Sequence, residues 1–233
     1  MQSRSTLLGL RKVELFKGID TYSLCEIAAQ CRWARCRRND YVVRRGDMGA
    51  EVYFVVDGML RVTAPAGRGR RITLQDVGAG ELFGEHSAID GRERLADVRA
   101  LRESLVASIP AEAFREIVAS HGLVRERLLQ RLARSVRELT DRLLEHGAQP
   151  VQRRIRTELA RLARAAGVDA NRARLDPAPT HSEIASRVGT RREQVTRELS
   201  RLARQGLLER AGRTLVMRDL AALDVLAGKP GPD

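Results

Sequence analysis

The segment from Ala111 to His146 has the clearest helical pattern of the chain. Apolar residues recur there in steps of four, four, three and four, at Leu128, Leu132, Val136, Leu139 and Leu143. This spacing places them on one face of a helix, and the residues between them are mostly Arg and Glu. We therefore expect one long helix over residues 111–146, and the preceding Pro110 suits its first turn. The stripe can pack on the preceding domain or on a second copy, as a two-stranded coiled coil in a homodimer.

Short β-rich runs separated by glycines precede this helix, over residues 41–109. About six such runs predict an antiparallel β roll or barrel. Turn residues predict a tight hairpin at Asp57-Gly58, a second hairpin at Gly67 and Gly69, and a further turn at Gly78 and Gly80. Ahead of the roll, Asp20 is expected to cap a short helix that ends near Gln30.

The charge of the chain points to an anionic partner. Its 233 residues suit two domains, and the net charge is +12 with an isoelectric point near 10.9. A balance this basic suggests nucleic acid or another anionic surface, although codon usage explains part of the excess of Arg over Lys. The sequence shows neither an apolar run of about 20 residues nor a secretory signal. We therefore expect a cytoplasmic protein with no membrane partner.

The reactive side chains do not form a catalytic or metal site. The four histidines are scattered at positions 86, 121, 146 and 181, without the spacing of a nucleophile and base or of metal ligands, so an enzyme is disfavoured. Three cysteines, Cys25, Cys31 and Cys36, are too few for an iron–sulfur cluster and odd for a disulfide framework. We interpret them as buried small residues.

Residues 83–100, FGEHSAIDGRERLADVRA, interrupt the strand pattern. Gly84 allows close approach of the backbone, and a short helical turn starting near His86 would offer free N–H groups to an anion. Glu85 can accept hydrogen bonds from ribose hydroxyls, and Arg94 can bind a phosphate. A Glu–Arg pair in a loop is also commonly an exposed salt bridge.

This stretch resembles the phosphate-binding cassette of cyclic-nucleotide-binding domains. The pattern is FGE, a short helix and Arg-x-Ala-x-Val, matched here by Phe83, Gly84, Glu85, Arg94, Ala96 and Val98. The resemblance implies that Glu85 binds the ribose 2′-hydroxyl and Arg94 the cyclic phosphate of an effector such as cyclic AMP. Leu95 stands where bacterial relatives carry Ser or Thr, so Ser87 is the candidate replacement donor, and Thr140 is the candidate adenine contact. A degenerate pocket, another effector, or haem bound through His86 remain alternatives.

A helix-turn-helix pattern follows a predicted helix at Val151–Ala166 and a loop over residues 167–179 with a short strand near Arg174-Leu175. Thr180 and Glu183 form a capping box that opens the first helix. Ala185 allows close helix crossing, Gly189 makes the left-handed turn and Val195 packs beneath the second helix. Thr190 is expected to cap that second helix. LLERAGRTLVMRD then predicts a wing of two strands turning at Ala211-Gly212.

The second helix carries residues suited to reading bases. Arg192-Glu193-x-Val195-x-Arg197 resembles the recognition helix of Crp/Fnr regulators of the catabolite activator branch, which read a TGTGA-like half-site. Glu193 can instead be a capping partner, while Arg210 and Arg213 are placed for phosphates. The candidate DNA contacts are Thr180, Arg191, Arg192, Glu193, Thr196, Arg197 and Arg213.

Together these features predict an α+β protein that resembles a Crp/Fnr transcription regulator. We expect an effector-sensing β roll over 1–110, a dimerisation helix over 111–146, a winged helix-turn-helix over 147–227 and a disordered tail over 228–233. The resemblance implies a homodimer that binds palindromic double-stranded DNA and contacts RNA polymerase. The alternatives are a regulator that needs no effector or another ligand, and a nucleoid-type coater. Such a coater would explain the charge but not the patterned recognition helix.

Overall fold

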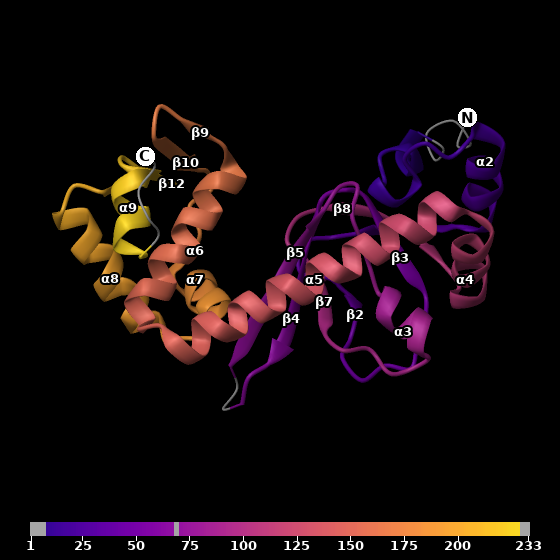
Figure 1. Ribbon diagram of the computed structural model, residues 1–233, viewed down its shortest axis with the longest axis horizontal. Helices are drawn as coiled ribbons and strands as arrows, with labels where there is room; N and C mark the ends of the chain where they lie inside the picture. Colours follow the sequence, from indigo (N-terminus) through magenta and orange to yellow (C-terminus); the bar gives the residue numbers. More distant parts are fainter. Residues whose placement is uncertain (1–7, 68–69, 229–233) are drawn as a thin grey trace. The chain divides into compact units, whose positions relative to one another are not determined.

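The computed structural model describes residues 8–67 and 70–228, with the backbone alone for residues 145–148. The chain divides into two compact units, one up to Arg137 and one from Glu138 onward, and each is described by itself (Figure 1). The division lies inside helix α5 (Gly122–Ala148). The predicted tail falls at residues 229–233, outside the described part, apart from Gly228.

The first unit is an antiparallel β roll of two four-stranded sheets, as predicted. One sheet has the order β1-β8-β3-β6 and the other β2-β7-β4-β5. The strands are β1 (Arg32–Cys36), β2 (Tyr41–Val43), β3 (Val52–Asp57), β4 (Met59–Pro65), β5 (Arg71–Gly78), β6 (Leu82–Phe83), β7 (Asp97–Ala100) and β8 (Ser104–Ile109). The helical elements are η1 (Glu14–Phe16), α2 (Thr21–Gln30), α3 (Glu85–Asp90), α4 (Ala111–Ser120) and the first part of α5.

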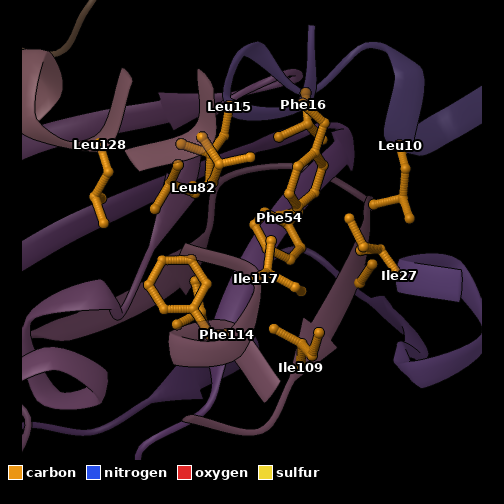
Figure 2. Close-up of a cluster of buried hydrophobic side chains, with 14 of the residues drawn as sticks. Leu10, Leu15, Phe16, Ile27, Phe54, Leu82, Ile109, Phe114, Ile117 and Leu128 are labelled. Atoms are coloured by element: carbon orange, nitrogen blue, oxygen red, sulfur yellow. The ribbon is translucent and has the colours of Figure 1, made fainter. Parts of the chain in front are cut away.

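Alternation along β3 divides the hydrophobic core of this unit between two clusters. Val52 and Phe54 contribute to a cluster with helices α2, α4 and α5, whereas Val55 contributes to a cluster between the sheets. Figure 2 shows part of the helix-side cluster, where the rings of Phe54 and Phe114 lie among aliphatic side chains. Phe16 and Phe54 pack with ring centroids 4.8 Å apart.

Two turn predictions are confirmed and one is wrong. β4 and β5 form the hairpin expected near Gly67, and Gly80 makes the turn after β5 with φ +92°. Asp57-Gly58 is not a hairpin, because β3 and β4 belong to different sheets and the chain passes from one to the other at Gly58. Gly58 has φ +104°, and a Cβ there would lie 2.1 Å from the Ser104 hydroxyl oxygen, so this crossing requires glycine.

The stretch predicted as one helix over residues 111–146 forms two, α4 and α5. His121 between them has an extended conformation, with φ −113° and ψ 101°. The Ser120 hydroxyl donates to the Glu116 carbonyl at 2.7 Å, and Gly122 follows. A serine that bonds to its own backbone and a glycine both weaken a continuous helix, which explains the interruption.

The apolar stripe of α5 also divides. Leu128 is 4% exposed, and Leu132 packs partly against the core of its own β roll. Val136, Leu139 and Leu143 are 63%, 56% and 73% exposed. The first part of the stripe therefore serves the fold of the single chain, and only its later part is available to a second copy.

The second unit is a winged helix domain. Its elements are α6 (Val151–Ala166), β9 (Val168–Asp169), β10 (Arg172–Leu175), α7 (His181–Val188), α8 (Arg192–Arg204), β11 (Leu208–Ala211), β12 (Thr214–Met217) and α9 (Leu220–Leu226). The strands form a sheet in the order β11-β12-β10-β9, which confirms the predicted strand at Arg174-Leu175. Ile155, Ile184 and Leu202 are fully buried in one core shared by α6, α7 and α8.

The wing is a tight hairpin of β11 and β12. Ala211 pairs with Thr214, so the two-residue turn is Gly212-Arg213, one position later than predicted. Gly212 has φ +59°, which suits glycine in such a turn. Across the described residues of both units, every helix is too short or too polar to span a membrane.

Candidate functional site

Gly84 fixes the entrance to the cassette between β6 and β7. It caps α3 with φ +87°, and a Cβ there would lie 2.7 Å from an Arg94 nitrogen and 2.9 Å from the Glu51 carbonyl oxygen. Only glycine fits this position without a shift of the backbone. The next residue, Glu85, begins α3 and is 3% exposed.

Arg131 on α5 is a cassette residue that the sequence did not indicate. Its Nε lies 3.5 Å from Glu85 Oε1, and its guanidinium donates to the Leu82 carbonyl at 2.6 Å. His86 Nδ1 lies 3.6 Å from the same carboxylate oxygen. Glu85 thus has a cationic partner in the absence of any effector.

Arg94 is buried at the centre of the cassette, with 3% exposure. Its guanidinium donates to the carbonyls of Gly84 at 3.0 Å and Glu51 at 2.8 Å, and it lies 3.3 Å from the Glu51 carboxylate. It also lies 5.7 Å from the centre of the Tyr53 ring. The Glu51 side chain is 45% exposed, so a bound anion could displace its carboxylate and meet a preformed arginine.

The structure brings together four of the six predicted ligand residues: Gly84, Glu85, Ser87 and Arg94. The buried Ser87 hydroxyl donates to the Glu93 carbonyl at 3.3 Å, so it currently closes the loop before Arg94. Leu95 points outward and is 59% exposed, which leaves its position without a hydroxyl donor. Thr140 is exposed on the part of α5 that belongs to the second unit, and its role stays a prediction.

The three cysteines are free, and one departs from its prediction. Cys36 is buried and Cys31 partly buried, and burial raises the pKa of Cys31 to about 12. Cys25 is exposed on α2, because it faces away from the buried Leu24 and Ile27 of that helix. Within the described ranges, His, Cys, Asp and Glu form no group of three that could hold a metal ion.

The helix-turn-helix has the predicted local chemistry. The Thr180 side chain accepts from the Glu183 amide at 3.2 Å, and the Glu183 carboxylate accepts from the Thr180 amide at 2.8 Å, which confirms the capping box. Gly189 ends α7 in the left-handed conformation, with φ +64°. Ala185 and Val195 are buried between the two helices, as expected.

The predicted cap of α8 is wrong. The N-cap is Arg191, without a side-chain cap bond, while the Thr190 amide donates to the Ala185 carbonyl at 3.0 Å. Thr190 therefore belongs to the turn that closes α7. Because Thr190 does not cap α8, Glu193 is not part of a second capping box, which favours its reading as a base contact.

Helix α8 presents Arg192, Glu193, Thr196 and Arg197 as exposed side chains, while Val195 and Leu202 are fully buried beneath them. His181 at the start of α7 was not among the predicted contacts, but its Nδ1 lies 2.8 Å from Thr196 Oγ1. A single histidine at a helix start carries no sequence signal for this contact. Arg213 is exposed at the tip of the wing, next to Gly212.

A buried carboxylate, Glu198, anchors α8 from behind. It is 4% exposed and accepts from Arg156 on α6 at 2.6 Å and from Arg201 at 2.9 Å. Burial raises the pKa of Glu198, but hydrogen bonds from Arg201 and Arg156 outweigh burial and lower the pKa below its usual value. This ion pair stabilises the orientation of α8 on α6 at neutral pH.

A basic groove of about 850 Å³ runs along the same flank of α8. Five arginines contribute to its lining: Arg153, Arg156, Arg197, Arg201 and Arg204. The exposed side of α8 thus continues into a positively charged surface, which suits the phosphates on either side of a major groove.

Comparisons with known proteins agree with both sites. Residues 33–121 match the family described as the cyclic nucleotide-binding domain, and residues 130–226 match the Crp-like helix-turn-helix domain. The cyclic AMP receptor protein of Thermus thermophilus is 31% identical over 183 residues, which cover 78% of this chain and 82% of that protein. A CRP-like cAMP-activated global transcriptional regulator of Mycobacterium tuberculosis is 26% identical across 90% of this chain and 94% of the relative.

Among solved structures, a CRP-family transcriptional regulator from Thermus thermophilus has 28% identity and a TM-score of 0.68, over 85% of this chain and 98% of its own. These domains are those of DNA-binding transcription regulators and not of enzymes. The chain belongs to the Crp/Fnr family of transcription regulators.

Proposed function

We propose that a homodimer of this chain binds palindromic DNA with TGTGA-like half-sites and controls transcription through contacts with RNA polymerase. The observation that carries the proposal is the exposed set Arg192, Glu193 and Arg197 on α8, which Glu198 anchors to α6. Arg can pair with guanine O6 and N7, and Glu can accept from cytosine N4. The chain should prefer a palindromic TGTGA-type duplex to a scrambled duplex at one salt concentration, and equal affinities would contradict the proposal.

The dimer in this proposal forms along α5. Leu129, Leu132, Val136, Leu139 and Leu143 recur in steps of three, four, three and four, which is the heptad spacing of a two-stranded coiled coil. Leu129 is 61% exposed, like the later members of the stripe. A C2 dimer would present two copies of α8 to successive major grooves, about 34 Å apart.

We further propose that an anionic effector, with cyclic AMP as the first candidate, binds at Glu85 and Arg94. The buried Arg94 and the positive φ of Gly84 support this, and the relatives named above include proteins described as cAMP-activated. Related folds serve other effectors, since a Xanthomonas campestris regulator with 24% identity is described as c-di-GMP responsive. Haem bound through His86 is the remaining alternative. The effector would act by binding preferentially to the dimer state that fits DNA, with α5 as the connection.

Calorimetry with cyclic AMP and cyclic GMP tests the effector. We expect binding of cyclic AMP to the wild-type protein, and loss of it in Arg94→Ala because the phosphate then faces no cation. Glu51→Gln should bind cyclic AMP several-fold more tightly, since it removes the carboxylate that competes for Arg94 while keeping the carbonyl contact. Absence of heat with either nucleotide in both the wild type and Glu51→Gln would contradict the cyclic-nucleotide proposal.

A further inference from the structure

His181 and Thr196 form a short hydrogen-bond chain on the exposed side of the helix-turn-helix. His181 Nδ1 lies 2.8 Å from Thr196 Oγ1, and the Thr196 hydroxyl donates to the Arg192 carbonyl at 3.1 Å. A hydroxyl has one hydrogen, so Thr196 must accept at its contact with His181. The imidazole hydrogen of neutral His181 is therefore on Nδ1, and Nε2 has a free lone pair.

Cations surround this ring. Arg192 from α8 and Arg210 from β11 act on it electrostatically, while the nearest carboxylate of its own helix, Glu183, is engaged with Thr180 in the capping box. Burial, Arg210 and Arg192 together lower the pKa of His181 below its usual value. In the free protein at neutral pH the ring is thus neutral, and its outer nitrogen is an acceptor. A phosphate, which has only acceptor oxygens, cannot bind to it in that state.

We propose that His181 contacts a DNA phosphate through Nε2 and that DNA binding takes up one proton from solvent at this nitrogen. The inference rests on the proposed DNA-binding function, since it places the phosphate beside the recognition helix. Protonation turns Nε2 into a donor and leaves the Nδ1 hydrogen bond to Thr196 intact. The phosphate supplies the negative charge that offsets Arg192 and Arg210, so the proton is held more tightly in the complex than in the free protein.

The sign of the effect follows from this difference. Because the pKa of His181 is higher in the complex than in the free protein, affinity rises as the pH falls. Between the two pKa values the dissociation constant changes by up to about tenfold per pH unit, the limit for one proton. A phosphate contact reads no base, so a scrambled duplex should show the same pH dependence as a palindromic one.

The test measures dissociation constants of the full-length protein at constant salt, from about pH 5.5 to about pH 8.5, the range in which histidine titrates. The probes are a palindromic TGTGA-type duplex and a scrambled duplex of equal length. His181→Asn should bind both with a flat pH profile and with the weak affinity of the wild type at high pH, since an amide nitrogen can replace Nδ1 but cannot titrate. His181→Arg should give a flat profile at the tight level. His121→Asn, a matched change in the first unit, should keep the wild-type slope.

Calorimetry in two buffers of different ionisation enthalpy counts the protons directly. We expect uptake of up to about one proton on binding by the wild type near the midpoint of the profile, and about none by His181→Asn. A flat wild-type profile with DNA bound would overturn the inference alone, as would a slope that persists in His181→Asn. Failure to bind either duplex at any pH would overturn the proposed function and this inference with it.

Discussion

A Val136→Asp variant is expected to sediment as a monomer and to lose more than about a hundredfold in affinity for palindromic DNA. Val136 is 63% exposed in the single chain and lies in the middle of the heptad stripe of α5. In the proposed dimer each aspartate would face its symmetry mate inside an apolar seam, where an unpaired charge costs several kcal/mol. Analytical ultracentrifugation and a DNA-binding titration measure the two effects.

Gln130→Asp is the matched control for this substitution. It adds the same charge to the same helix at an exposed polar position off the stripe. The control should remain dimeric and bind DNA like the wild type. A Val136→Asp protein that stays dimeric with unchanged DNA affinity would show that the interface lies elsewhere.

Arg192→Ala and Arg197→Ala are each expected to cost about 1–3 kcal/mol of specific binding, which is the usual value of a bidentate contact between arginine and guanine. Both side chains are exposed near the N-terminal end of α8, the end that a helix-turn-helix presents to base edges. Affinity for scrambled DNA should fall much less. Fluorescence anisotropy with both duplexes at one salt concentration separates the two effects.

Arg213→Ala provides the comparison, because it removes a cation from the tip of the wing. It should weaken both duplexes alike and reduce the salt dependence of binding, as expected for a phosphate contact. An Arg192→Ala protein that keeps its full preference for the palindrome would place the base-reading residues outside α8.

The sequence predicts features whose chemistry is local. The Thr180–Glu183 capping box and the left-handed Gly189 need only neighbouring residues, and both are present. Contacts between distant residues were missed. Arg131 and His181 meet Glu85 and Thr196 only because particular helix faces meet in the folded unit, and spacing along the chain does not reveal this.

Two errors concern signals that stay the same in different folds. The turn at Asp57-Gly58 has a positive φ as predicted, but a turn residue does not reveal which sheet receives the next strand. The break at His121 was hidden because Ile117 and Val124 are seven residues apart, so the apolar period continues across it. Thr190 matched a cap by residue type, although the turn of α7 required its amide.

The most direct test of the account compares three duplexes at one salt concentration, using the wild-type protein. One has two TGTGA-type half-sites in palindromic arrangement, the second has about five base pairs inserted between them, which is half a helical turn, and the third is scrambled. We expect the palindrome to bind at least about a thousandfold more tightly than the scrambled duplex, with most of that preference lost on insertion. Equal affinity for all three would contradict the claim that a dimer of this chain reads two half-sites through α8.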